Sequence, residues 1–154
     1  MRLWHYKLIP VLPKEMLVSQ WRECIAIKRQ WEKGTLKHRL VSYVMDYDRC
    51  HFLTYVIRIG NEMAKRNINF QRKYSDEIAS FCFNHRTNSE MGLYPEHNNR
   101  YLKQCYYNLQ EKYDRGIITK EEWQKIEDLI GGEIEWAKKK ELNYILKYMM
   151  NLLI

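Results

Sequence analysis

The sequence predicts an all-α protein, and three observations lead to this fold class. Glycine and proline are scarce, with 6 and 3 in 154 residues, whereas an all-β fold needs many turns. Apolar residues recur at helical spacing along several segments. Hydrophobic residues make up 45% and charged residues 29% of the chain, as in globular proteins. We expect a single compact helical domain of about six helices, with an extended N-terminal arm and a C-terminal helical hairpin.

The first elements follow from the prolines and one glycine near the start of the chain. Residues 1–12 are expected to form the extended arm, because Pro10 and Pro13 interrupt them. Proline is tolerated in the first turn of a helix, so a helix is predicted over 14–33, with Gly34 ending it. One face of this helix carries residues at three- and four-residue spacing: Leu17, Trp21, Cys24, Lys28 and Trp31.

Three further helices are predicted before the middle of the chain. A short helical piece is expected over 38–45, a long helix over 48–66 and a short one over 75–83. Asp48 is a suitable N-cap for the long helix, because its carboxylate can accept a backbone hydrogen bond. The apolar face of that helix is the most regular in the sequence: Phe52, Tyr55, Val56, Ile59 and Met63.

The second half of the chain contains a polar loop and then more helices. Residues 84–98 are predicted to be a loop, and a helix is predicted over 98–113. Thr119 and Glu122 form a capping box that begins the next helix, and Gly131–Gly132 is expected to break it. The last helix carries an apolar stripe: Leu142, Ile145, Leu146, Met149, Leu152 and Leu153.

Positive charge is concentrated in the first half of the chain. The net charge is +7, and residues 1–73 hold 15 Lys and Arg against 6 Asp and Glu. Residues 74–154 hold 11 against 13, so the whole excess lies in the first half. Such a concentrated basic region indicates a polyanionic partner such as nucleic acid.

Several other classes of protein are not supported by the sequence. Lys7 and two prolines stand where a secretory signal needs an apolar run, and no apolar stretch approaches the roughly 18 residues that span a bilayer. We therefore expect a cytoplasmic protein with no membrane partner. Four scattered cysteines lack a C-x-x-C pair, so we expect reduced, mostly buried thiols: Cys24, Cys50, Cys82 and Cys105.

No cofactor or metal is expected either. The sequence has no glycine-rich phosphate loop and no H-x-x-x-H spacing. His85 and His97 share a polar loop with Glu90 and Glu96, which is a weak metal-like cluster. We interpret these four as solvated loop residues.

Three segments of the sequence together resemble a known protein family. The first joins Met-Arg-Leu-Trp at 1–4 to Trp-Arg-Glu at 21–23. The second runs through 62–70, and the third joins 93–97 to 109–112. Together they cover roughly residues 1–113 and resemble a divergent member of the pyrimidine-dimer DNA glycosylase family of the phage endonuclease V type. This resemblance implies a glycosylase-like helical domain over 1–118, and we expect residues 119–154 to be a helical extension packed on the same domain.

The resemblance implies a two-stage reaction that needs no metal. The backbone amine at the N-terminus attacks C1′ of the damaged nucleotide, the base leaves, an imine forms, and β-elimination cuts the strand. A glutamate on the first long helix assists, and here that residue is Glu23. An α-amino group has a reference pKa of about 7.7–8.0, against about 10.4 for lysine, so it is often neutral and nucleophilic. Glu23 would stabilise positive charge on the sugar and move protons.

The sequence departs from the phage type at several positions. Arg2 stands where a small residue would allow removal of the initiator, so we expect Met1 to be retained and its amine to be the nucleophile. Met16 replaces a histidine of the phage type, and His5 is a candidate for that role. The aromatic C-terminal segment of the phage type has no counterpart. Three tyrosines lie on a predicted helix, where core packing is expected: Tyr106, Tyr107 and Tyr113.

Arginines near these groups are the candidates for binding DNA. Arg2 and Arg22 lie beside Met1 and Glu23 in sequence. Arg22 and Arg29 are seven residues apart and share a helix face, with the small Ala26 between them. The fixed fork of donors in arginine suits phosphate oxygens.

The leading hypothesis is a DNA repair glycosylase with abasic-site lyase activity on damaged pyrimidines. Its partner would be double-stranded DNA, and a monomer is expected. One alternative is a non-catalytic basic module that binds nucleic acid. Another is an all-α interaction protein whose C-terminal hairpin mediates assembly.

Overall fold

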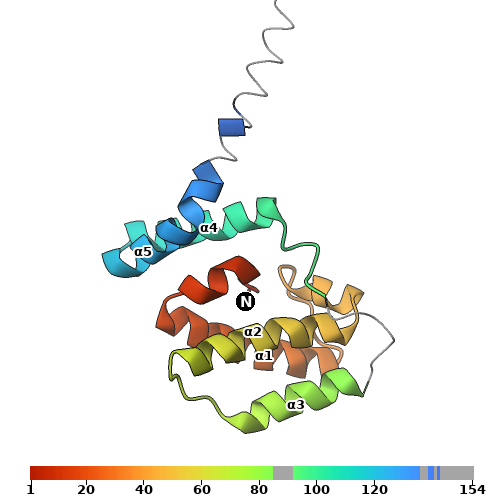
Figure 1. Ribbon diagram of the computed structural model, residues 1–154. Helices are drawn as coiled ribbons and strands as arrows, with labels where there is room; N and C mark the ends of the chain where they lie inside the picture. The colour runs from red at the N-terminus through yellow and green to blue at the C-terminus, as the bar shows by residue number, and fades with distance from the viewer. Residues whose placement is uncertain (85–91, 136–138, 141, 143–154) are drawn as a thin grey trace, which may run out of the picture. The chain divides into compact units, whose positions relative to one another are not determined.

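The computed structural model describes residues 1–84, 92–135, 139–140 and 142, and this part of the chain contains helices and no strand (Figure 1). The all-α prediction is confirmed. The chain forms two compact units, Met1–Cys105 and Tyr106–Ile154. The division into 1–118 and 119–154 stays a prediction. Most of the predicted last helix, from Ile145 onward, lies outside the described residues.

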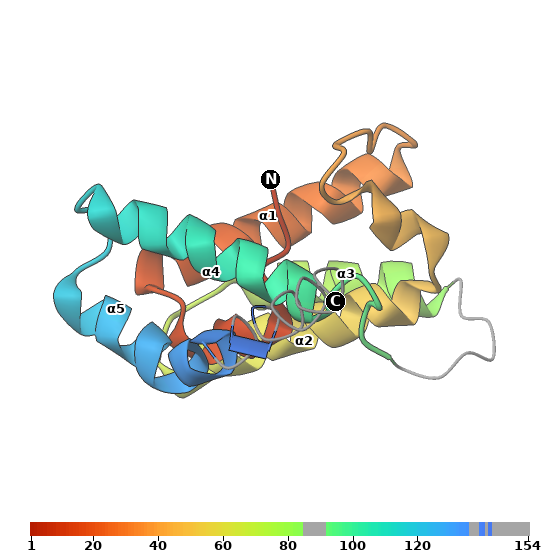
Figure 2. The same cartoon turned by 90° about the horizontal axis from the view of Figure 1, so that it is seen from above.

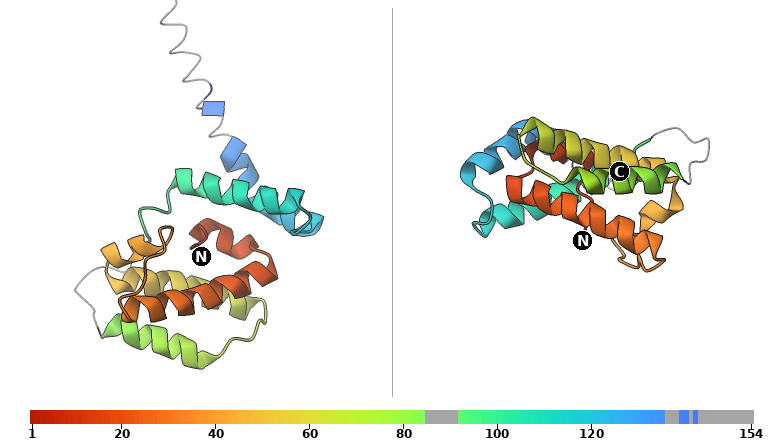
Figure 3. Two further views of the ribbon diagram at one scale, coloured as in Figure 1. Left: turned by 180° about the vertical axis from the view of Figure 1, so that it is seen from behind. Right: turned by 90° about the horizontal axis from the view of Figure 1, so that it is seen from below.

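Three helices pack against one another in the first unit: α1 (Lys14–Glu32), α2 (Arg49–Lys65) and α3 (Arg72–Phe83). They run side by side in every view (Figures 1 and 3). The 3₁₀ helices η1 (Tyr6–Val11) and η2 (Ser42–Asp46) both contact α2. The core between these elements contains fully buried apolar side chains: Leu8, Leu17, Ile27, Phe52, Ile59 and Met63.

Local signals in the sequence set the bounds of these helices. Asp48 accepts a hydrogen bond from the Cys50 amide and is the N-cap of α2, as predicted. Gly34 follows α1 with φ +67°, a conformation that favours glycine. The predicted bounds of α1 and α2 are confirmed to within one residue. By contrast, α3 begins at Arg72, three residues earlier than predicted.

The N-terminal arm is only partly extended. Residues 1–5 have no regular structure, but Tyr6–Val11 forms η1, so the prediction of an extended chain over 1–12 is wrong there. Proline disrupts the interior of a long α-helix because it lacks an N–H and its ring clashes with the preceding turn, but its fixed φ lies within the range of a short 3₁₀ helix. His5 caps η1 by accepting the Lys7 amide.

The second unit contains the end of α4 (Asn99–Asp114), then α5 (Lys120–Ile126) and a π-helical turn, η3 (Glu127–Gly131). The capping box at the start of α5 is confirmed, with Thr119 as N-cap. Within this unit, three aromatic rings pack together: Tyr106, Tyr113 and Trp123.

The two glycines after α5 do not break the helix, contrary to the prediction. Helical structure continues from η3 through residue 135. A Cβ on Gly131 would lie 2.8 Å from the Glu127 carboxylate, and Gly132 has ordinary helical angles. Gly131 therefore lies inside the helical run, with the Glu127 carboxylate close to it in the π-helical turn.

Candidate active site

The N-terminus lies beside α1 (Figure 2), the helix that carries Glu23. The backbone amide of Arg2 donates a hydrogen bond of 3.1 Å to Oε2 of Glu23. Three covalent bonds separate the Met1 amine from that amide nitrogen, so the two nitrogens are about 3–4 Å apart. Met1 and Glu23 are both half-buried. Met1 and Glu23, the two residues that the sequence suggested, therefore lie close together, and neither residue is fully buried.

Side chains from three helices bind the backbone of the arm just after this point. The Trp4 amide donates to Oε1 of Gln20 on α1 at 2.9 Å. The Tyr55 hydroxyl on α2 donates to the Trp4 carbonyl at 2.8 Å, and the Tyr101 hydroxyl on α4 donates to the Leu3 carbonyl at 2.6 Å. The sequence did not indicate that these three side chains bind the arm, although Tyr55 was predicted on the apolar face of its helix. The spacing of Gln20, three residues before the glutamate, was the available signal, since it places both on one face.

Two histidines lie against the beginning of η1. His97 accepts the Tyr6 amide at Nδ1, at 3.3 Å, and its Nε2 lies 2.9 Å from the Tyr43 hydroxyl. Burial lowers the pKa of His97 to about 3, and the neighbouring His5 acts in the same direction. His5 accepts the Lys7 amide at Nδ1, so its Nε2 donates to the His97 carbonyl at 2.8 Å. Because His5 is 1% exposed and bonded to backbone on both sides, it is poorly suited to carry protons.

The interpretation of His97 as a solvated loop residue is wrong. It is 6% exposed, because tyrosine rings surround it and both its ring nitrogens have partners in the protein. Glu96 accepts a hydrogen bond from the Tyr47 hydroxyl. His85 and Glu90 lie outside the described residues. Within the described part of the chain, no group of three or more His, Cys, Asp or Glu could hold a metal ion.

The arginines predicted to share a face do line one groove. This arginine groove has a volume of about 460 Å³ and is lined by Arg22, Ile25, Ala26, Arg29, Gln30 and Tyr74. Arg22 and Arg29 are exposed, and the Arg29 guanidinium lies 5.3 Å from the centre of the Tyr74 ring. Arg2 does not line this groove, and its guanidinium lies 5.2 Å from the centre of the Trp4 ring. The arginine groove therefore offers two positive charges around a small residue.

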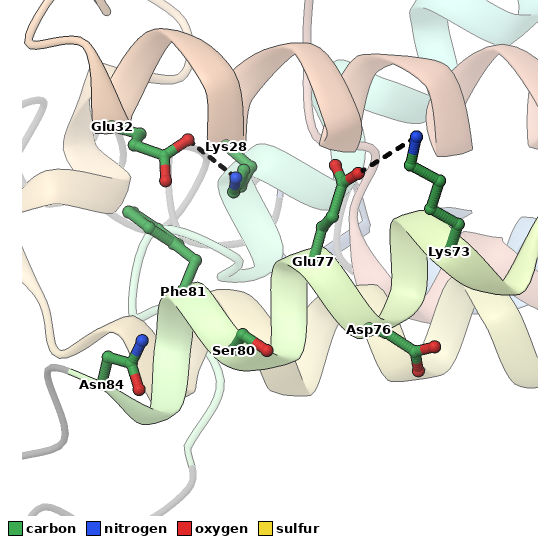
Figure 4. A pocket seen from close by; sticks show the side chains of 8 residues that line it. All are labelled: Lys28, Glu32, Lys73, Asp76, Glu77, Ser80, Phe81 and Asn84. Atoms are coloured by element: carbon green, nitrogen blue, oxygen red, sulfur yellow. Dashed lines mark hydrogen bonds and ion pairs between the residues drawn. The ribbon is translucent and has the colours of Figure 1, made fainter.

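A second groove is also lined by residues of α1 and α3, but its charge is different. This ion-pair groove, of about 590 Å³, is lined by Lys28, Glu32, Lys73, Asp76, Glu77, Ser80, Phe81 and Asn84 (Figure 4). Lys28 pairs with Glu32 at 2.7 Å, and Lys73 pairs with Glu77 at 4.0 Å. With Asp76 added, acidic groups outnumber basic ones, so this surface does not suit a phosphate backbone.

The remaining predicted features concern burial. All four cysteines are buried and none of them forms a disulfide, as expected. Burial raises the pKa of the Cys82 thiol to about 12, which disfavours the reactive thiolate.

Tyr106 is buried as predicted and its hydroxyl donates to Glu127, whereas Tyr107 is 38% exposed. None of the helices in the described ranges is long and apolar enough to cross a bilayer.

Fold and site together define a helical protein in which a backbone amine adjoins a glutamate and a basic groove follows on the same helix. Residues 1–76 match the family model described as pyrimidine dimer DNA glycosylase. The predicted resemblance to that family is confirmed over these residues, which contain α1, α2 and the N-terminal arm. The third resembling segment, 93–97 with 109–112, lies beyond the match. No curated protein and no solved structure matches the chain.

Proposed function

We propose that the protein is a pyrimidine dimer DNA glycosylase that also cleaves the strand as an abasic-site lyase. The family match supports the first activity. The hydrogen bond between the Arg2 amide and Glu23 is the observation that carries the second. The bond supports a mechanism in which a backbone amine and a carboxylate act on one reacting carbon. We propose the amine of Met1 as the nucleophile and Glu23 as its partner.

The proposed reaction needs only these two groups and water. The neutral amine attacks C1′, the N–C1′ bond forms, and the bond from C1′ to the base breaks, with its electron pair leaving on the base. Opening of the sugar gives an imine between the amine and C1′. Loss of a proton from C2′ then expels the 3′ phosphate, and hydrolysis of the imine returns the amine. Glu23 stabilises the positive charge on the sugar and carries protons between these steps.

Binding to DNA is assigned to the arginine groove. Arg22 and Arg29 are exposed and project from the outer side of α1, where fork-shaped donors can contact phosphates. Arg2 adjoins the amine and is assigned to the damaged strand. Reaching C1′ in a duplex requires a nucleotide to be unstacked, which takes a few kcal/mol and less at damaged sites. The partner is therefore duplex DNA carrying a lesion.

Borohydride trapping tests the nucleophile. The protein is mixed with duplex DNA containing an abasic site or a thymine dimer, and borohydride reduces any imine to a stable adduct. We expect one adduct, on the peptide that begins with Met1, as identified by mass spectrometry. An adduct on a peptide that begins at Arg2 would overturn the role of Met1. Salt-sensitive binding without an adduct favours the non-catalytic nucleic-acid module, and no binding at low salt favours the interaction protein.

Glu23→Gln tests the carboxylate. Removing a general acid–base group typically slows a reaction by about 10²–10⁴-fold, so base release should fall by at least about 100-fold. Affinity for DNA should change less than about threefold, since the arginine groove is intact. Glu15→Gln is the matched control, because Glu15 is an exposed glutamate in the first turn of the same helix. Base release unchanged in Glu23→Gln, measured by single-turnover kinetics, would remove Glu23 from the mechanism.

A further inference from the structure

The backbone of the N-terminal arm is bound from two sides. On the side of α1, Glu23 accepts the Arg2 amide and Gln20 accepts the Trp4 amide. On the other side, the Tyr101 hydroxyl donates to the Leu3 carbonyl and the Tyr55 hydroxyl donates to the Trp4 carbonyl. Four hydrogen bonds from side chains to the backbone of residues 2–4 thus fix the chain that leads to the amine.

We propose that Tyr101 is a positioning residue, which keeps the N-terminal amine beside Glu23 by binding the Leu3 carbonyl. The inference rests on the proposed function, in which that amine is the nucleophile. Among the hydroxyl contacts to the arm, this one is nearest to Met1 along the chain. Tyr55 acts in the same way one residue further on.

The chemistry of Tyr101 suits a permanent donor. Burial, helped by the nearby Cys105 and Tyr43, raises the pKa of Tyr101 far above its ordinary value, so the hydroxyl keeps its proton. Its bond to the Leu3 carbonyl, 2.6 Å, is at the short end of the range for O–H···O bonds. Leu3 is fully buried, so water would not readily replace the Tyr101 hydroxyl as donor to the Leu3 carbonyl if that hydroxyl were removed.

The position of Tyr101 is itself fixed by its neighbours. The Asn98 side chain accepts the Tyr101 amide at 3.1 Å at the start of α4, and the His97 ring lies 5.2 Å from the Tyr101 ring. His97 in turn accepts the Tyr6 amide. These residues follow the stretch matched by the family model, so residues 92–105 of the first unit complete a site that begins within 1–76.

Fixing the arm matters because the nucleophile is the first atom of the chain. Termini are poorly ordered unless they are tied down. A reaction between bound groups depends steeply on their geometry, and a displacement of about 1 Å can slow it by about 100-fold. A side-chain nucleophile is restrained by its rotamers, whereas a backbone amine depends on contacts such as that of Tyr101.

The test compares Tyr101→Phe with Tyr47→Phe. Both remove one hydroxyl that makes a hydrogen bond in the first unit, but the Tyr101 hydroxyl bonds to the arm whereas the Tyr47 hydroxyl bonds to Glu96. With saturating abasic-site DNA, we expect Tyr101→Phe to slow borohydride trapping about tenfold, with the Kd for DNA changed less than twofold. Tyr47→Phe should trap at the wild-type rate. A role limited to stability would lower the folded fraction and leave the single-turnover rate of folded protein unchanged.

Amide hydrogen exchange gives a second measurement that needs no DNA. The Trp4 amide, which bonds to Gln20, should exchange several-fold faster in Tyr101→Phe than in Tyr47→Phe. Wild-type trapping and exchange in Tyr101→Phe would overturn the inference, as would equal slowing in both variants. If the wild-type protein forms no adduct, the proposed function fails. Exchange then decides whether Tyr101 fixes the arm, with unchanged Trp4 exchange counting against it.

Discussion

The inner and outer sides of α1 carry different kinds of side chain, although residues of the two sides, such as Arg22 and Glu23, are adjacent in the sequence. On the inner side, Gln20 and Glu23 bind backbone amides of the arm. On the outer side, Arg22 and Arg29 are exposed and line the arginine groove. A step of one residue turns an α-helix by about 100°, so adjacent residues face different partners.

This difference separates two tasks within one helix. The inner side fixes the protein's own N-terminus, so changes there should alter the reaction rate or the stability of the fold. The outer side carries unshielded positive charge, so changes there should alter affinity and its dependence on salt. The ion-pair groove, which has lysines already paired with carboxylates, serves as a natural control for the outer side.

The largest effect on DNA affinity is expected from Arg22→Ala with Arg29→Ala. Each phosphate contact is worth about tenfold in affinity near 0.1 M salt, because it releases condensed counterions. The double variant should bind duplex DNA about 100-fold more weakly, and the slope of log K against log salt should fall by about two. Fluorescence anisotropy over a range of salt concentrations measures both quantities.

Lys73→Ala sharpens this comparison. Lys73 has an exposed side chain, but it lies in the ion-pair groove opposite Glu77. Removing it should change affinity by less than about twofold, whereas the single variant Arg29→Ala should lose about tenfold. Equal losses in these two variants would show that only net charge matters and that the arginine groove has no special role.

The next effect concerns the histidine that lies against the arm. The folded-state pKa of His97, about 3, is below its ordinary value of 6.5. Above pH 6.5 the His97 ring is neutral in both the folded and the unfolded chain, so its titration does not reduce the free energy of unfolding. As the pH falls below 6.5, the unfolded chain binds a proton that the folded chain does not, so stability is lost progressively down to about pH 3. The loss between pH 6.5 and 5 should be about 2 kcal/mol.

Urea unfolding at several pH values tests this dependence. Over that pH range, His97→Gln should show a clearly smaller loss of unfolding free energy than the wild type. His38→Gln is the control, since His38 is exposed, and it should keep the wild-type slope. The same slope in His97→Gln and the wild type would contradict the assignment.

The helices could be predicted because their signals are local. Asp48 and the Thr119 capping box lie within a turn of the helices they begin, and apolar residues at helical spacing define the buried faces. The errors arose where a residue has two structural uses. Pro10 ends a long α-helix but fits a 3₁₀ helix, and Gly131 is a helix breaker that here gives room to a carboxylate.

The site was predictable only in part, for a related reason. Arg22 and Arg29 share a face through spacing within one helix, so the arginine groove followed from local sequence. The contact of Arg2 with Glu23 joins residues 21 apart, and only the family resemblance suggested it. The Tyr101 hydroxyl bonds to a carbonyl 98 residues away in the sequence, and a contact over that separation cannot be predicted from local sequence patterns.

The smallest of these effects tests the far end of the arm. Arg66 donates from Nη1 to the Leu12 carbonyl at 2.6 Å and from Nη2 to the Pro10 carbonyl at 2.7 Å, while its Nε pairs with Glu62. Lysine keeps the charge but cannot form this fork. Arg66→Lys should therefore lower the unfolding free energy by about 1–2 kcal/mol and leave DNA affinity unchanged.

Arg115→Lys is the matched control for Arg66→Lys. Arg115 pairs with Glu111 at the same i,i+4 spacing, but both side chains are 65% exposed, against 25% and 11% for Arg66 and Glu62. An exposed pair contributes about 0–1 kcal/mol, so Arg115→Lys should change stability by less than about 0.5 kcal/mol. If the two variants lost equal stability in urea, the carbonyl contacts of Arg66 would add nothing to its ion pair. The arm would then depend on the inner side of α1 and the two tyrosines alone.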